Sequence, residues 1–236
     1  AVAALLSARA ADPGTVERIA REHTVCPFEL SLDAAVWSDV VVADYNYVFD
    51  PVVRLQRFAG DAEAAVLVDE CHQLAPRVRD MLSLALDRRT VRAALAEGQP
   101  AELARRTRGL DRALTTLRRE HDLGDERQID TPEKLLRSLR RFVDAVATAD
   151  EPLEPYPATR ALLFEASRWV RSESWYDAER FVYLAEAQRR DVTVRMLCLD
   201  PGPYIHEVLS GFGGHVRFSG TASPLPVYAA AHGAPD

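Results

Sequence analysis

The chain has no long hydrophobic run, few cysteines and no excess of basic charge. None of its apolar stretches approaches the roughly 18 uninterrupted residues of a membrane span. Its three cysteines stand far apart in 236 residues, which argues against a disulfide framework. No basic segment precedes the apolar residues 1–6, so we expect the end of a helix from a longer chain instead of a signal peptide. These absences together predict a cytoplasmic protein.

The basic residues that are present are concentrated in the middle of the chain. The formal net charge is −7, but residues 76–190 carry 22 basic and 20 acidic side chains, and the remainder carries 7 and 16. Of the 29 basic residues, 28 are arginine. Such a segment can contact phosphates at selected points without offering a broad basic face. A solvated helical surface with i,i+4 ion pairs explains it equally well, so charge alone does not identify a nucleic-acid partner.

A glycine-rich phosphate loop is also absent. The pattern GxxxxGK followed by Ser or Thr, whose backbone amides cradle nucleotide phosphates, occurs nowhere in the sequence. The 236 residues therefore cannot build that kind of phosphate site by themselves.

The most informative stretch is an apolar run that ends at once in two carboxylates, a thiol and an imidazole. Residues 65–68, Ala-Val-Leu-Val, are followed by Asp69, Glu70, Cys71 and His72. We predict a buried parallel strand whose carboxyl end presents the acids to a crevice, where open α/β sheets bind ligands. An Asp there can hold Mg²⁺ through its water shell, and the adjacent Glu can orient or deprotonate a water. The alternative is that both acids only stabilise the first turn of the following helix.

Further segments extend this motif into a family resemblance. They are Cys26-Pro27-Phe28-Glu29, the stretch WSDVVVADYNYVFDP at residues 37–51, Cys198-Leu199-Asp200-Pro201, and FSGTASPL at residues 218–225. In this order and at this spacing, with the DECH tetrapeptide between them, they resemble the iron–sulfur helicases of the XPD/DinG family in superfamily 2. The resemblance covers the chain nearly end to end and is weakest between Leu86 and Arg190.

The resemblance implies roles for the residues of the DECH tetrapeptide. Asp69 would contact the Mg²⁺ of bound ATP, Glu70 would position and activate the hydrolytic water, and His72 would link the nucleotide site to the third motif. The alternative for His72 is a helix-start histidine hydrogen-bonded to the backbone. Cys71 replaces the usual alanine; a thiol is little larger than a methyl group, so we expect a small buried hydrophobe without a redox role.

The resemblance also assigns the third motif and a cluster ligand. Ser219, Gly220 and Thr221 would couple phosphate state to the grip on DNA, although they could also form an ordinary polar strand-to-loop turn. Cys26 matches the last of four cysteines that hold a 4Fe–4S cluster in the family. Such clusters normally need four thiolates, so we expect no cluster in this chain. Cys198 is expected to be a core residue.

Aromatic residues offer a second place for DNA contact. Tyr45, Asn46 and Tyr47 invite a base-stacking interpretation, because aromatic platforms bind single strands with little sequence preference. The alternation of a strand would instead bury one of the two tyrosines. The three tryptophans are expected in the core or at an interface; they are Trp37, Trp169 and Trp175.

The periodicity of apolar residues predicts how the chain is organised. We expect strands at residues 40–43, 65–68, 192–198 and 215–218, and helices between the second and third of these. Apolar positions from Val78 to Leu86 are interpreted as helical, and Thr131-Pro132-Glu133 predicts a helix start with a hydroxyl cap and Pro at the first helical position. One narrow helical seam is formed by Leu103, Thr107, Leu110, Leu114 and Leu117.

The predicted fold class is α/β: a partial RecA-like parallel sheet of the P-loop NTPase type, interrupted by a mostly α-helical insertion. By the resemblance, residues 1–38 are the end of the iron–sulfur domain and residues 39–75 are a first part of the first motor domain with the DECH box. Residues 76–190 are the Arch domain, and residues 191–236 are a further part of the motor domain with the third motif.

The resemblance implies part of an ATP-dependent DNA helicase, of 5′-to-3′ polarity, that serves repair or recombination. Its partners would be ATP, Mg²⁺ and single-stranded or forked DNA, and the full-length protein would be a monomer with a 4Fe–4S cluster. We expect the 236 residues alone to be inactive, because the phosphate loop and a second motor domain are missing from them. A nucleotide-independent nucleic-acid-binding or scaffold module derived from such a helicase is the alternative; a small hydrolase using Asp69 and Glu70 is a weaker one.

Overall fold

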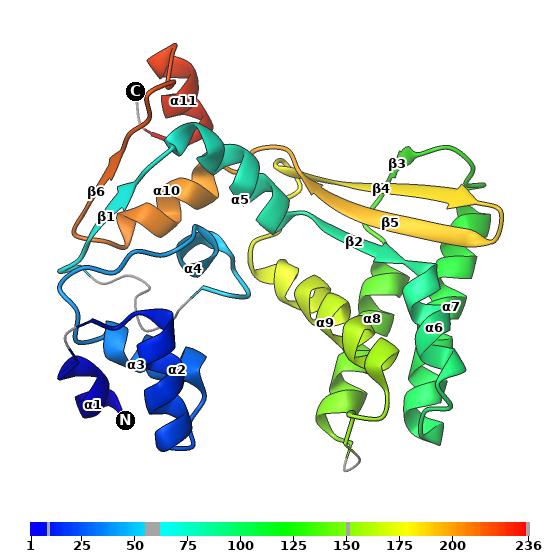
Figure 1. Cartoon of the computed structure of the whole chain (residues 1–236). Coiled ribbons are helices and arrows are strands. Elements are labelled where there is room, and N and C mark those ends of the chain that lie inside the picture. The colour runs from blue at the N-terminus through cyan, green and yellow to red at the C-terminus, as the bar shows by residue number, and fades with distance from the viewer. Residues whose placement is uncertain (9, 55–61, 150–151, 235–236) are drawn as a thin grey trace. The chain divides into compact units, whose positions relative to one another are not determined.

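The computed structural model describes residues 1–8, 10–54, 62–149 and 152–234 (Figure 1). These residues form two compact units, Ala1–Asp44 and Tyr45–Asp236. Residues 55–60, which lie between the first two predicted strands, are outside the described residues. Among the residues described, none of the helices combines the length and the apolar character that a membrane crossing requires.

The first unit is a small three-helix body. It consists of α1 (Val2–Leu6), α2 (Pro13–Glu22) and α3 (Pro27–Ala35). Asp12 caps α2 by accepting a hydrogen bond from the Thr15 amide at 2.8 Å. Its core contains Leu5, Ile19, Ala20, Leu30 and Ala34.

The prediction of a strand at residues 40–43 is wrong. This segment follows α3 without sheet pairing, and the side chains of Val40 and Val42 are 78% and 95% exposed. Four apolar residues in a row favour a strand, but a strand persists only where a second strand satisfies its backbone groups. None of the described strands pairs with this segment.

In the second unit a small parallel sheet carries the sequence motifs. Strand β1 (Ala65–Val68) pairs in parallel with β6 (Gly214–Arg217), and Val68 with Arg217 is the last residue pair of the register. Around it are α4 (Asn46–Phe49), η1 (Cys71–Gln73), α5 (Leu74–Leu82), α10 (Gly202–Ser210) and α11 (Leu225–Ala231). This mixed α/β arrangement confirms the predicted fold class. Only Val68 of β1 is buried, because the sheet has two strands and β1 lies at its edge.

A second, antiparallel sheet was not foreseen. It has the strand order β2 (Leu84–Asp87), β5 (Asp191–Cys198), β4 (Phe181–Gln188) and β3 (Arg127–Ile129). Residues 192–198 do form a strand, but their expected place in the parallel sheet is wrong, because they pair with β4 and β2. Alternation of apolar and polar residues indicates a half-buried strand, but it does not indicate which other strand pairs with it. The interpretation of Ala85 and Leu86 as helical is also wrong, since both lie on β2.

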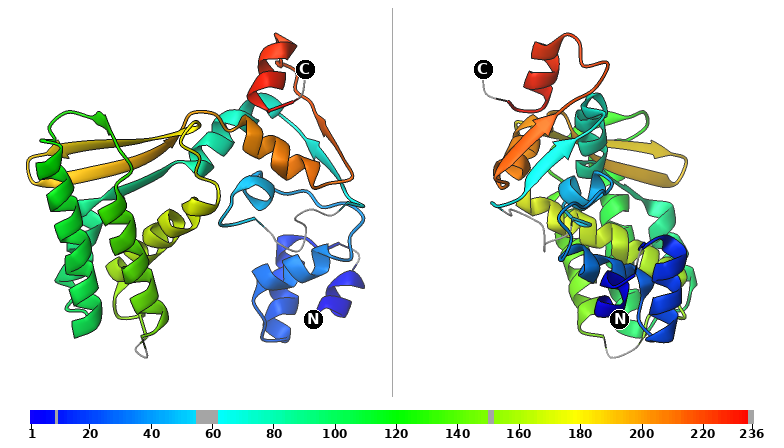
Figure 2. Two further views of the ribbon diagram at one scale, coloured as in Figure 1. Left: turned by 180° about the vertical axis from the view of Figure 1, so that it is seen from behind. Right: turned by 60° about the vertical axis from the view of Figure 1, so that its left-hand side comes forward.

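Four helices lie against this sheet (Figures 1 and 2). They are α6 (Arg88–Ala96), α7 (Ala101–Glu120), α8 (Glu133–Ala147) and α9 (Pro157–Arg171), followed by η2 (Ser172–Ser174). The predicted seam of α7 is confirmed, because its five residues are the buried ones of that helix. The start of α8 is confirmed within a residue, but the expected cap is wrong: Pro132 occupies the N-cap position, and no side chain caps the helix.

The four-part division of the chain stays a prediction. Its boundary at Arg190 falls within the hairpin of β4 and β5, where Gln188 pairs with Asp191. The antiparallel sheet therefore contains residues from both sides of that boundary.

Candidate functional site

The two carboxylates lie in a tight turn between β1 and η1, which we call the carboxylate turn (residues 69–71). The Glu70 amide donates to Asp69 Oδ1 at 2.7 Å, and Glu70 has φ 48° and ψ 41°, in the left-handed region. A side chain other than glycine is strained there, and such strain is concentrated at functional sites. The Cys71 amide then donates to the Phe218 carbonyl at 3.0 Å, which joins the turn to the end of β6.

A network of side chains connects the two strand ends. His72 Nδ1 lies 2.8 Å from Ser219 Oγ and 3.1 Å from Glu70 Oε2. Ser219 Oγ lies 3.3 Å from the same carboxylate oxygen and 3.3 Å from Thr221 Oγ1, and it accepts from the Thr221 amide at 3.2 Å. Gly220 connects Ser219 to Thr221 with open space where a Cβ would stand. The structure therefore brings the DECH tetrapeptide and the third-motif residues into direct contact.

The hydrogen bonds of His72 fit one tautomer. Gln73 Nε2 lies 3.0 Å from His72 Nε2, and an amide nitrogen can only donate, so His72 Nε2 would be the acceptor. The proton of a neutral imidazole is then on Nδ1, where it can be donated to Glu70 Oε2 or Ser219 Oγ. Glu70 Oε1 makes no hydrogen bond to the described residues, and the Glu70 side chain is 63% exposed. One carboxylate oxygen is thus anchored, and the other can meet a water.

Cys71, the last residue of the carboxylate turn, and His232 are both buried. Cys71 is buried, and burial raises the pKa of its thiol, in keeping with the expected small hydrophobe. His232 is 3% exposed, and burial together with the Arg217 charge lowers its pKa. Arg217 also donates to the His232 carbonyl at 3.3 Å. No sequence signal pointed to His232, because a lone histidine near the end of a helix has no spacing to recognise.

Tyr45 supports the turn from α4. Its hydroxyl donates to the Asp69 carbonyl and lies 3.1 Å from the Glu70 carbonyl, and the Arg77 guanidinium stands 5.5 Å from the centre of its ring. Asn46 and Tyr47 lie in α4 and not on a strand, so the alternation that we weighed for this segment does not apply. DNA contact by these three residues stays a prediction. One face of the Tyr45 ring is already covered by Arg77.

The three cysteines do not fit an iron–sulfur cluster. Cys26 is exposed at the N-cap of α3, whereas Cys71 and Cys198 are buried in the second unit. The prediction that Cys198 is a core residue is confirmed, with 0% exposure. Within the described ranges, His, Cys, Asp and Glu form no group of three or more that could hold a metal ion. One exposed thiolate cannot replace the four that a cluster needs.

Mg²⁺ makes a smaller demand on the protein. It commonly keeps several waters and is held through one or two carboxylates together with substrate phosphates. Asp69 is exposed at the end of β1, and its Oδ1 is used by the Glu70 amide. The residues present therefore fit a water-mediated contact from Asp69 to such an ion, and no more than that.

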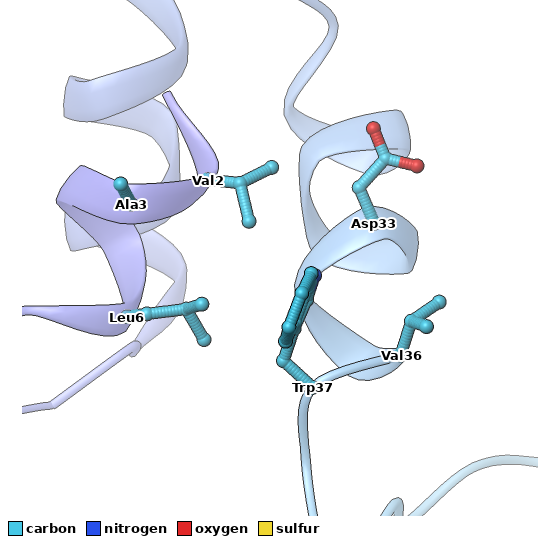
Figure 3. Close-up of a pocket in the computed structure, with 6 residues that line it drawn as sticks. All are labelled: Val2, Ala3, Leu6, Asp33, Val36 and Trp37. Atoms are coloured by element: carbon cyan, nitrogen blue, oxygen red, sulfur yellow. The ribbon is translucent and has the colours of Figure 1, made fainter.

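The first unit has a shallow apolar depression of its own (Figure 3). Trp37, Val36 and Leu6 line it together with Val2, Ala3 and Asp33. Trp37 is 72% exposed and is therefore not a core residue, so its expected place at an interface stays a prediction, whereas Trp169 is fully buried and stacks on Tyr183 at 6.3 Å. Trp175 is half-buried and packs against the core of the second unit. Apart from Asp33 the lining of the depression is apolar, and its side chains do not define a reaction.

A parallel strand that ends in Asp-Glu-Cys-His thus contacts a Ser-Gly-Thr turn that follows the neighbouring strand. Residues 2–91, which include the DECH tetrapeptide, match the family model described as DEAD_2. The similarity to this family therefore applies to that part of the chain.

Two solved structures share the fold. One titled "XPD_Helicase" is 15% identical with a TM-score of 0.56, and covers 94% of this chain and 39% of its own. A second, titled "Truncated XPD", is 14% identical with a TM-score of 0.55, and covers 93% of this chain and 62% of its own. The chain therefore spans less than two thirds of either structure. No curated protein matches the sequence.

Proposed function

We propose that this chain supplies the DECH side of the ATP site of a DNA helicase, which couples ATP hydrolysis to unwinding. The observation that supports the proposal most directly is the contact of Glu70, His72 and Ser219 at the ends of two parallel strands. Ligands of α/β sheets bind at this edge. The phosphate loop and the second motor domain would be contributed by polypeptide outside the 236 residues.

Each residue of the site has a chemical role in this proposal. Asp69 would hold, through a water, the Mg²⁺ that accompanies ATP, and that ion would supply positive charge beside the phosphates. Glu70 Oε1 orients the attacking water and accepts its proton, while Oε2 stays anchored. His72 and Ser219 connect Glu70 by hydrogen bonds to the loop that contains Thr221. The 5′-to-3′ polarity, the role in repair or recombination and a resident cluster are carried over from the family resemblance.

The test is DNA-stimulated ATP hydrolysis by the longest natural protein that contains this chain. Glu70→Gln should lower kcat by about 10²- to 10⁴-fold, because it removes a general base, whereas Glu207→Gln on the surface of α10 should leave kcat unchanged. We expect the 236 residues alone to show no turnover. Wild-type turnover in Glu70→Gln would refute the assignment. Glu70-dependent turnover by the isolated 236 residues would refute the need for a further phosphate loop.

One observation favours the second candidate, a nucleotide-independent nucleic-acid-binding module. The outward face of α7, opposite its buried seam, carries four exposed arginines at helical spacing: Arg105, Arg108, Arg112 and Arg119. Arginine binds phosphate through two parallel hydrogen bonds. Binding of labelled single-stranded DNA to this chain, unaffected by ATP and lost in Arg108→Glu/Arg112→Glu but not in Arg18→Glu/Arg21→Glu, would favour this module. Binding that depends on ATP would favour the helicase.

A further inference from the structure

Tyr45 is the only described side chain that holds the backbone of both acids in the carboxylate turn. Its hydroxyl bonds to the Asp69 carbonyl and lies 3.1 Å from the Glu70 carbonyl. We propose that Tyr45 is a positioning residue, whose phenol fixes the direction in which Asp69 and Glu70 leave β1. The meaning of this for hydrolysis rests on the proposed function, but the positioning itself does not.

The turn needs such support because its own geometry is unfavourable. Glu70 adopts a left-handed conformation, which is unfavourable for a residue with a side chain. The Glu70 carbonyl also accepts from the Gln73 amide at 2.8 Å, but Tyr45 is the donor to the Asp69 carbonyl among the described residues. Among the described strands β1 pairs with β6 alone, so none of them restrains the turn from the other side of β1. The phenol therefore provides a restraint that the sheet does not.

The ring of Tyr45 is itself held in place. The Arg77 guanidinium from α5 covers one face at 5.5 Å, and Phe49 meets the ring edge-on at 6.4 Å. The other end of α4 is tied to α10, because the Tyr204 hydroxyl donates to the Phe49 carbonyl at 3.0 Å. A helix of one turn is thus anchored at its start by one tyrosine and at its end by another, so the position of the Tyr45 hydroxyl is well defined.

The phenol remains a donor over the whole physiological pH range. Burial raises the pKa of Tyr45, and the neighbouring Cys71, Asp69 and Glu70 raise it further against the opposing effect of Arg77. A protonated phenol has the single hydrogen that the Asp69 carbonyl accepts, with the Glu70 carbonyl 3.1 Å away.

The chain contains its own reporters for a test. Cys71 follows the two acids directly and is 3% exposed, Cys198 is fully buried on β5, and Cys26 is exposed in the first unit. Alkylation of Cys71 therefore requires opening of the carboxylate turn, alkylation of Cys198 requires unfolding of the antiparallel sheet, and Cys26 reacts in either state. The rates can be followed separately by mass spectrometry of the three cysteine peptides after treatment with N-ethylmaleimide.

The informative variant is Tyr45→Phe, which keeps the ring and removes the hydroxyl. We expect the alkylation rate of Cys71 to rise about tenfold, equivalent to about 1.4 kcal/mol of local closing free energy, with the rates of Cys198 and Cys26 unchanged. Tyr47→Phe makes the same chemical change two residues away, where the hydroxyl has no hydrogen-bond partner among the described residues, and should leave all three rates unchanged.

Two results would overturn the inference. An unchanged Cys71 rate would show that the hydroxyl does not hold the turn. Equal acceleration of Cys71 and Cys198 would show that Tyr45 contributes only to general stability. Neither result bears on whether Glu70 is the catalytic base, and a failed ATPase test of Glu70→Gln would leave the labelling result intact. The two proposals can therefore fail separately.

Discussion

Glu97 should be one of the most important single side chains for the stability of the helical region. It ends α6, but its carboxylate caps the start of α9: Oε1 accepts from the Ala158 amide at 2.6 Å, and Oε2 accepts from the Thr159 amide at 2.9 Å and from the Thr159 hydroxyl at 2.7 Å. α9 has no capping side chain of its own, because Tyr156 at its N-cap position makes none of these bonds. The cap therefore also fastens α6 to α9.

The cost of removing this carboxylate follows from the bonds it makes. Loss of a helix cap costs roughly 0.5–2 kcal/mol, and hydrogen bonds to a charged group contribute about 1.5–3 kcal/mol each when well shielded. Thr159 is fully buried and would keep only its bond from Gln99, at 2.6 Å. Glu97 is partly exposed, so we expect Glu97→Ala to lower the free energy of unfolding by roughly 2–4 kcal/mol. Glu97→Gln keeps one acceptor and should lose about half as much.

Urea unfolding followed by circular dichroism measures this difference. Glu120→Ala is the matched control, because Glu120 forms only an exposed ion pair with Lys134, and should cost less than about 1 kcal/mol. Burial alone would raise the pKa of Glu97, but the hydrogen bonds from Thr159 and Ala158 outweigh it, so the pKa is lowered from 4.5. The stabilisation is therefore complete above pH 4.5 and is lost as the pH falls through the lowered pKa. Equal losses in Glu97→Ala and Glu120→Ala would refute the reasoning.

Two further predictions concern Gly233, which contacts the first residue of α10, and the two acids Glu165 and Asp87. Gly233 has φ +63°, and a Cβ there would stand 2.3 Å from the Gly202 carbonyl oxygen, so Gly233→Ala should destabilise the chain by roughly 2 kcal/mol or more in urea unfolding. Gly109→Ala, with open space in the middle of α7, should instead stabilise it by about 0.5–1 kcal/mol, and the same sign in both variants would contradict the argument. Burial, with the charge of Asp87, raises the pKa of Glu165 above 4.5, so the folded state is penalised at neutral pH and relieved in acid. Glu165→Gln should therefore raise the melting temperature at pH 7 but not below pH 4.5, and an equal gain at both pH values would count against this cause.

The sequence patterns were reliable where the structure of an element depends mainly on its own residues. Residues 65–68 form the predicted parallel strand with the predicted ends, because an apolar run stops at two acids that belong outside a sheet, but the expected burial is wrong for Ala65 and Leu67, which are exposed. The seam of α7 was also predicted correctly, since a 3.6-residue period identifies the buried face of a long helix without reference to its neighbours.

The patterns failed where the structure of a segment depends on which other segment pairs with it. Residues 192–198 alternate as a strand should, yet nothing in them specifies β4 and β2 as partners instead of β1. Residues 40–43 are as apolar as β1 and remain unpaired. The support from Tyr45 could not be predicted either, because a hydroxyl bonded to backbone carbonyls 24 and 25 residues away leaves no periodicity in the sequence.

The parallel pairing of β1 with β6 has a consequence for the order of folding. Ala65 and Gly214 are partners, although about 150 residues separate them, and closing a loop of that size is entropically costly. The pairing of Leu84 with Met196 shortens the remaining loop to about 40 residues, which saves roughly 1 kcal/mol because each halving of length is worth about 0.6 kcal/mol. The antiparallel sheet should therefore form before the parallel one, and the two acids should reach their final geometry late in folding.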